Sequence, residues 1–257
     1  MIRKTQGVFV ILIALLTLTA TLSIPASADS QMHATLTLAS SQVDAGSAFN
    51  VTYQTTGVSG SARVYLQRQF GTAKVWKSVR QLKGAEGTVS APSVQIGEYK
   101  YRILILVGRK MMTSATKTLY SYGSIAFGTV CLNHKISNSG NCSTGTAQEG
   151  TTILSYAGEF GSQNYPTYDQ ALSARTTTCR SVTLQFAMQT VSISTAYVQI
   201  IQSASDPQAQ STGPGTIGTF SATLDGGPWI LNVASSNSQY DYVLINGTFN
   251  CYSTTGF

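Results

Sequence analysis

The stretch Gly97-Glu98-Tyr99-Lys100-Tyr101-Arg102-Ile103-Leu104-Ile105-Leu106-Val107 decides the fold class of this chain. Alternate positions carry large apolar or aromatic side chains, namely Tyr99, Tyr101, Ile103, Ile105 and Val107. This period of two predicts a β strand, because successive side chains of a strand point to opposite faces. Leu104 and Leu106 lie on the other face, so we expect the far half of the strand to be covered on both sides.

Shorter alternating segments precede this strand. Residues 34–38, 49–54 and 63–67 alternate apolar and polar positions, and clusters of Gly, Ser and Asp separate them. Such runs predict about seven strands and no long helix in the first half of the chain, residues 29–122. A half with about seven strands fits an immunoglobulin-like β-sandwich.

Several motifs of the first half resemble those of bacterial immunoglobulin-like domains. They are residues 64–68 (VYLQR), Trp76, residues 87–89 (GTV) and residues 97–102 (GEYKYR). The resemblance implies a spacer or adhesive module. It also places Tyr99 where the family has its corner tyrosine, whose hydroxyl bonds back to the chain. Unlike antibody domains, this half has no cysteine pair to join its sheets.

The second half, residues 123–257, follows an expected short linker at residues 121–124. Period-two alternation is clearest at residues 182–188, 196–200, 220–224 and 229–233. Asp225-Gly226 and Asn246-Gly247 predict hairpin turns, because such turns need positive φ at their central residues. These features predict a second antiparallel sandwich, so the fold class is all-β with two sandwiches.

The layout of the second half resembles jelly-roll modules of the galactose-binding type from secreted bacterial proteins. Cys179 opens a strand, the run LDGGPW occupies residues 224–229, and the final strand carries Cys251. The resemblance implies binding of a carbohydrate or a cell surface and assigns no individual binding residue.

The four cysteines all lie in the second half and predict disulfides, because their number is even and the chain is expected to be exported. Three pairings are open. Cys131–Cys142 with Cys179–Cys251 is preferred, because the first closes a short loop and the second joins two strand-like segments. A zinc site is the rival interpretation, and the absence of C-x-x-C spacing argues against it.

The N-terminus has the three parts of a cleavable signal peptide over residues 1–28. Arg3 and Lys4 are followed by an apolar run and by small residues before Asp29. The run is too short for a full membrane span of roughly 20 apolar residues. We therefore expect a secreted or cell-surface protein with no transmembrane segment in the mature chain.

Charge is divided unevenly between the halves. Residues 29–122 carry eleven Lys and Arg against four Asp and Glu, whereas residues 123–257 carry three against six. Four cations around Trp76 are a candidate patch for an anionic polymer: Lys74, Lys77, Arg80 and Lys83. The alternative is a solvated edge strand, because Lys and Arg prevent edge-to-edge pairing. No recognition helix or aromatic-interleaved groove motif points to nucleic acid.

Exposed aromatic rings beside amides or carboxylates would suit a sugar ligand, because binding sites pair an apolar platform with a few polar groups. The aromatic candidates in the second half are Tyr156, Tyr165, Tyr168, Trp229, Tyr240 and Tyr242, with the carboxylate of Asp241 between the last two. The alternative is that these rings pack in the core. Residues 213–218 match G-x-G-x-x-G, but strands flank them and we expect a loop.

No catalytic constellation is evident, and the expected function is non-catalytic binding of a glycan or cell-surface polymer. The first alternative is an extracellular protein-interaction or adhesive module, or an inhibitor. The second is a small glycoside hydrolase using Glu159 and Asp169, since such enzymes need two carboxylates flanking a bond. No metal site or cofactor is expected, because no loop has calcium-ligand spacing, although loop Asp and Asn oxygens could hold a structural calcium ion.

Overall fold

A computed structural model gives the fold of this chain. It describes residues 31–92, 94–132, 135–136, 140–161, 163–165, 168–174, 177–189, 192–202, 208–236 and 241–253. The expected signal peptide lies outside these residues. Strands dominate the described chain, and nearly all of their pairings are antiparallel, which confirms the all-β prediction. Among the described residues, no helix has the length and apolar character needed to span a membrane.

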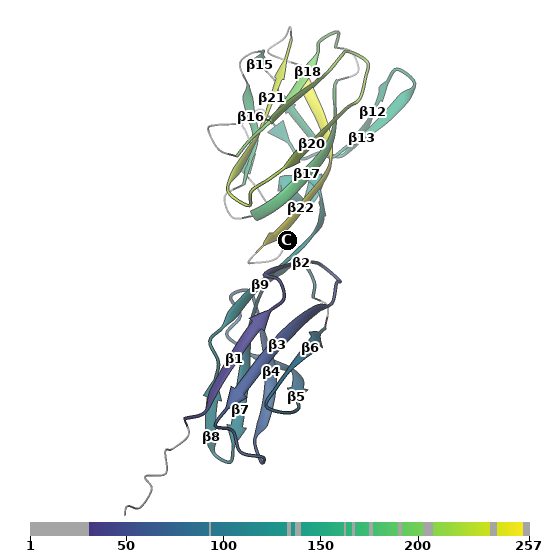
Figure 1. The fold of residues 1–257 in the computed structure, drawn as a ribbon. Coiled ribbons are helices and arrows are strands. Elements are labelled where there is room, and N and C mark those ends of the chain that lie inside the picture. Colours follow the sequence, from purple (N-terminus) through teal and green to yellow (C-terminus); the bar gives the residue numbers. More distant parts are fainter. Residues whose placement is uncertain are drawn as a thin grey trace, which may run out of the picture.

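The first half places two groups of strands around one core (Figure 1). One group is a three-stranded sheet in the order β1 (His33–Leu38), β3 (Phe49–Thr56) and β6 (Glu86–Ala91). The other group contains β2 (Gln42–Asp44), β4 (Arg63–Phe70), β5 (Lys77–Leu82), β7 (Gly97–Val107), β8 (Lys110–Thr113) and β9 (Lys117–Ala126). Side chains from both groups form a single hydrophobic cluster.

The central strand β7 has the burial that its sequence predicts. Tyr99, Tyr101, Ile103 and Ile105 are buried in the cluster, and Leu104 is buried on the opposite face. The strand is therefore covered on both sides at that point. It pairs with β4 over eight residues and with β9 over five, which makes it the centre of its sheet.

The second half also has two groups of strands around its own core. A six-stranded sheet contains β10 (Lys135–Ile136), β15 (Gln163–Asn164), β16 (Asp169–Ala174), β18 (Ala196–Ile201), β19 (Gln208–Thr212) and β21 (Trp229–Ser235). The other group contains β11 (Gly140–Asn141), β14 (Gly158–Gly161), β17 (Thr177–Met188), β20 (Gly218–Thr223) and β22 (Tyr242–Ser253), and both groups contribute side chains to one hydrophobic cluster. A hairpin of β12 (Gly145–Glu149) and β13 (Thr152–Tyr156) packs through Ala147 and Leu154 onto Ala187 of β17 and Leu244 of β22. The short helix α1 (Phe127–Leu132) contributes to the core.

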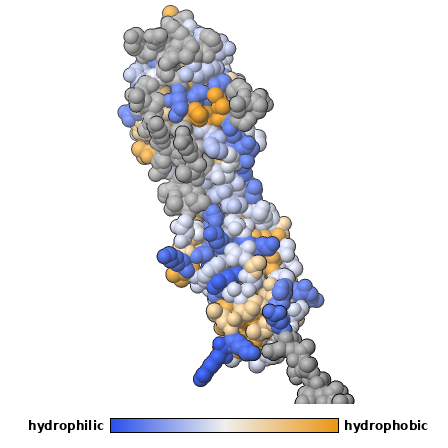
Figure 2. Space-filling model, turned by 90° about the vertical axis from the view of Figure 1, so that its left-hand side faces the viewer, coloured by the Kyte–Doolittle hydropathy of each residue, from blue (hydrophilic) through white to orange (hydrophobic). Residues whose placement is uncertain are grey.

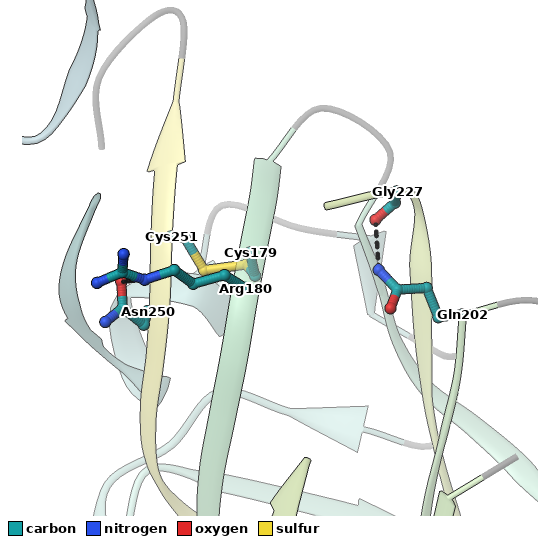
Figure 3. Close-up of a disulfide and its surroundings, with 6 residues drawn as sticks. All are labelled: Cys179, Arg180, Gln202, Gly227, Asn250 and Cys251. Carbon is teal, nitrogen blue, oxygen red and sulfur yellow. Dashed lines mark hydrogen bonds between the residues drawn. A yellow bond between two sulfur atoms is a disulfide. The ribbon is translucent and has the colours of Figure 1, made fainter. Parts of the chain in front are cut away.

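Both disulfides have the preferred pairing, which is thereby confirmed. Cys131 of α1 bonds to Cys142, which follows β11. Cys179 of β17 bonds to Cys251, its direct partner on β22. The second bond therefore links two neighbouring strands of one sheet rather than two facing sheets (Figure 3).

The strand β9 runs through the boundary between the halves. Its first part pairs with β7 and β2, and its last part, from Gly123 to Ala126, pairs with β22. The expected linker at residues 121–124 is therefore wrong, because these residues continue a strand that both halves use. The two core clusters lie on either side of this crossing, while the division at Gly123 itself stays a prediction.

Arg180 of β17, in the second half, contacts β2 of the first half at the point where β9 passes from one half to the other. The pairing of β17 with β22 shifts register between Cys179 and Ser181, so Arg180 is the extra residue of a β-bulge. A bulge changes the direction in which the side chain of the extra residue points. Arg180 donates to the Asn250 side chain at 3.2 Å, beside the Cys179–Cys251 disulfide (Figure 3). It also forms an ion pair with Asp44 of β2, and its guanidinium lies 4.9 Å from the centroid of the Tyr122 ring.

Two expected hairpin turns have a different role. Asn246-Gly247 lies inside β22, with Gly247 opposite Leu184, so the hairpin prediction is wrong there. Asp225-Gly226 does form a turn, with Gly226 at φ +84°. That turn connects β20 to β21, which belong to different sheets, so it does not close a hairpin.

Candidate functional site

Three tyrosines of the second half form a partly exposed cluster. The rings of Tyr165 and Tyr197 stack with centroids 4.4 Å apart and planes 15° apart. Tyr168 meets Tyr165 edge-on, with centroids 6.0 Å apart. Tyr165 is 50% exposed, and the other two rings are half-buried. We call these three residues the tyrosine platform.

Two strands and one loop position the tyrosine platform. On β18, Ala196, Val198 and Ile200 point into the core, so Tyr197 points outward. Tyr165 follows β15 and is fixed beside β21 by a hydrogen bond from its backbone N–H to the carbonyl of Ser235, 2.7 Å long. The platform therefore lies on the outer face of the six-stranded sheet.

Amide side chains continue the same outer face. Gln199 is two residues after Tyr197 on β18 and accepts a hydrogen bond of 3.3 Å from the Asn232 side chain on β21. Gln170 of β16 lies opposite Asn232 on the other side. The face therefore combines stacked rings with amide donors and acceptors. Such a combination can bind the apolar face and the hydroxyls of a sugar together.

Burial changes the acidity of one platform hydroxyl, that of Tyr168. It raises the pKa of the Tyr168 hydroxyl, and the neighbouring Tyr165 and Tyr197 raise it further. The hydroxyl therefore remains a neutral donor and acceptor at neutral pH. A neutral ligand fits such a surface better than a strongly charged one.

Trp229, the first of the predicted ligand residues, is a core residue. It is 1% exposed, and its ring stacks on Phe249 with centroids 4.7 Å apart. The prediction of an exposed ring is wrong, because Trp229 shares the inward face of β21 with Leu231 and Val233. That alternation was already visible in the sequence. Tyr240 lies outside the described residues.

The predicted ligand residues that lie outside the platform do not form one site with it. Tyr242 is exposed at the start of β22, while Tyr156 is half-buried against the small core beneath the β12–β13 hairpin. Asp241 accepts a hydrogen bond of 2.7 Å from the Ser192 hydroxyl, so it is engaged within the chain. Sequence reasoning missed Tyr197, although its place between buried residues of an alternating run indicates an outward ring.

The basic residues Lys74, Lys77, Arg80 and Lys83 are all exposed. Lys77 and Arg80 belong to β5, which ends its sheet and has β4 as its paired neighbour. Arg80 reaches the carbonyl of Ser90 at 2.8 Å. This location fits the edge-strand interpretation, in which cations protect an open edge from pairing.

The carboxylates that a hydrolase would need are not brought together by the described contacts. Glu159 is half-buried on β14, opposite Leu244 of β22. Asp169 begins β16 in the other sheet, and its side chain lies outside the description. Among the residues that are described, no group of three or more His, Cys, Asp and Glu is placed to hold a metal ion.

Comparisons with known proteins add no family. No protein-family model and no curated protein matches the chain. A solved structure titled "Structure of infectious bursal disease virus Gx strain" is 11% identical, with a TM-score of 0.28 over 81% of this chain and 56% of that one. This chain thus spans little more than half of that viral chain. A solved structure of two C2 domains of Extended-Synaptotagmin 2 is 8% identical, with a TM-score of 0.17 over 76% of this chain and 86% of that one. Both likenesses are too weak to support an argument.

Proposed function

We propose that this chain is an exported, non-catalytic protein that binds a carbohydrate or a cell-surface polymer through its second half. The observation that carries the proposal is the tyrosine platform, with Tyr165 half exposed and stacked on Tyr197 beside the amides of Gln199 and Asn232. In this account the first half is a spacer that presents the second.

The chemistry of the platform favours a sugar over a protein partner. A pyranose has an apolar face that stacks on aromatic rings and a rim of hydroxyls that bonds to amides. A protein interface would instead be expected to offer a contiguous apolar patch. On the face drawn in Figure 2, the second half shows a small apolar group among polar residues, whereas a wider apolar area lies at the lower end of the first half.

The finer fold classes belong to the same proposal. We classify the first half as an immunoglobulin-like β-sandwich and the second as a jelly-roll-like one. Tyr99, the corner tyrosine of that resemblance, is buried in the core of the first half. Export is supported by the two disulfides, because such bonds persist in oxidising compartments.

A glycan and cell-wall polymer array with the mature chain tests the proposal. We expect saturable binding at both low and high salt, because a neutral platform depends little on charge. Tyr165→Ala and Tyr197→Ala should each weaken binding about tenfold, if a stacked sugar ring is stabilised within the range of about 1–3 kcal/mol that a stacked nucleobase shows. Tyr65→Ala, a half-buried tyrosine on β4 of the first half, is the matched control and should bind normally.

Three results would count against the proposal. Binding that disappears at high salt would move the site to the basic residues of the first half. Binding that survives both platform substitutions would place it elsewhere in the second half. Absence of binding to every polymer would leave an extracellular protein partner as the better account.

A further inference from the structure

A separate cavity of about 610 Å³ opens beneath the tip of the β12–β13 hairpin. The hairpin turn forms one wall and the loop at residues 213–218 forms the other. The base is provided by Gln185 of β17 and Thr219 of β20, which are direct partners in the sheet. Cavities of roughly 300–1,000 Å³ are the usual size of small-molecule sites.

The side chain of Glu149 is the unusual member of this cavity. It is 4% exposed, and its Oε1 atom has no hydrogen-bond partner among the described residues. Its position explains the burial, because Ala147 and Glu149 alternate on the face of β12 that packs onto the sheet. A carboxylate therefore occupies a position where the pattern of the strand calls for an apolar residue.

Such a carboxylate is costly for the fold. A buried polar atom without a partner loses its hydration and gains nothing in return. Burial accordingly raises the pKa of Glu149. A ligand that brings a hydrogen-bond donor to Oε1 would remove this penalty, because the carboxylate can only accept hydrogen bonds when it is ionised.

Two glycines allow the walls of the cavity to approach each other. Gly150 and Gly215 have φ values of +59° and +67°, which residues with side chains rarely adopt. A Cβ atom on Gly150 would lie 3.3 Å from the carbonyl oxygen of Gly215. The entrance beside Glu149 is thus lined by backbone as well as by side chains.

The remaining lining decides the class of ligand. Thr152 and Thr219 add hydroxyls, and Ile153 and Ile217 add apolar surface. Calcium normally takes six to eight oxygen ligands, often with several carboxylates. Glu149 is the one carboxylate among the described residues that line this cavity. Hydroxyls, one amide, one carboxylate and two aliphatic side chains instead match a small ring that carries hydroxyl groups.

We propose that this cavity binds a single sugar residue, one hydroxyl of which donates to Oε1 of Glu149. The cavity and the tyrosine platform lie on different sheets of the second half: the hairpin packs on β17 and β22, and the platform lies on β18 and β21. The proposal therefore stands on its own observations and does not depend on glycan binding at the platform.

The test is a nuclear magnetic resonance titration of the mature chain with monosaccharides, each added alone. The probes are D-galactose, D-glucose, D-mannose and N-acetyl-D-glucosamine, with ethylammonium chloride as a cationic probe. We expect at least one sugar to shift the backbone amide signals of Gly150 and Gly215 saturably. Glu149→Gln should weaken that binding about tenfold, because a hydrogen bond to a charged acceptor is stronger than one to a neutral amide.

Controls separate a loss of contact from a loss of folding. Glu159→Gln changes a half-buried carboxylate of β14 outside the cavity lining and should bind as the unmodified chain does. Ile153→Arg places a bulky group at the rim, where Ile153 is 66% exposed, and should also weaken binding without disturbing the core. Tyr197→Ala removes one ring of the tyrosine platform. It should leave the sugar-induced shifts of the Gly150 and Gly215 amide signals unchanged, whether or not the platform itself binds a sugar.

Three outcomes would overturn the proposal. The first is that no sugar shifts the two glycine signals. The second is that Glu149→Gln and Ile153→Arg both bind sugar as well as the unmodified chain. The third is that ethylammonium binds while the sugars do not, which would make the cavity a site for organic cations.

Discussion

Gly247→Ala should strongly destabilise the second half. Gly247 lies in β22 with φ +138°, a region that residues with side chains avoid. A Cβ atom there would overlap the carbonyl oxygen of Thr183 and lie 2.8 Å from the Cα atom of Leu184. Both contacts are to the backbone of β17, which cannot move aside as a flexible side chain could.

The expected loss is the sum of two costs. The unfavourable φ costs about 1–3 kcal/mol, and the forced separation of β17 from β22 adds about 1–3 kcal/mol. We therefore expect the free energy of unfolding to fall by about 4 kcal/mol. With a urea dependence of about 2 kcal/mol per molar, the midpoint should fall by about 2 M.

Urea unfolding followed by tryptophan fluorescence in a Trp76→Phe background is the assay, because the remaining indole, that of Trp229, is buried in the core of the second half. Gly215→Ala is the control: its φ is also positive at +67°, but a Cβ atom would meet nothing within 4 Å. It should cost only the conformational part, about 1–2 kcal/mol. Equal shifts of the urea midpoint for the two variants would contradict the close approach of β17 and β22 at Gly247.

Three further predictions concern Arg180 between the halves, the turn at Asp225-Gly226 and the buried Glu149. Arg180→Ala removes an ion pair, a hydrogen bond and a ring contact, and should lower the unfolding free energy by about 1–2 kcal/mol. Asp44→Asn should cost less, because exposed ion pairs contribute about 0–1 kcal/mol, and equal urea shifts would contradict this account. Gln202→Ala leaves the Asp225 N–H without its acceptor, 2.7 Å away (the same side chain also donates to the Gly227 carbonyl), and should cost about 1–2 kcal/mol; an unchanged thermal melt would disprove that role. Glu149→Gln should raise stability at pH 7 and make no difference below about pH 4, where the acid is protonated in both states. This direction follows from the raised pKa of Glu149 in the folded protein. Burial of Glu149 does not lower the unfolding free energy while the group is protonated, but it lowers that free energy as the pH rises through the folded pKa. Thermal melts over pH 3–8 measure this, and a difference independent of pH would refute it.

Local patterns predicted the strands well, because alternation is a property of neighbouring residues. The clearest case is β7, whose inward and outward faces both follow from its sequence. The same alternation puts Trp229 on the inward face of β21. Trp229 was wrongly predicted to be a ligand residue because it was chosen for its aromatic ring and not for its position in the alternating run. The disulfides followed from loop length and strand pattern.

The failures share a non-local cause. Asn246-Gly247 has the composition of a hairpin turn, yet β22 continues through it because β17 lies against Gly247. Asp225-Gly226 makes its turn, but the choice of sheet for the following strand depends on partners far away in sequence. The stacking of Tyr165 on Tyr197 likewise joins residues 32 positions apart, which no short pattern could indicate.

The course of β9 has a mechanical consequence. The described chain begins at the far end of the first half, and β22 ends at Ser253 beside the crossing (Figure 1). A pull on these two points loads the first half and the contacts between the halves, which are the pairs from Gly123 with Cys251 to Ala126 with Thr248 and the ion pair of Arg180 with Asp44. It also loads β17, which is paired with the end of β22 and bonded to it at Cys251. In the described part of the chain, the six-stranded sheet of the second half has no strand paired with β9 or β22. Its outer face can therefore stay intact and accessible while the chain is under tension.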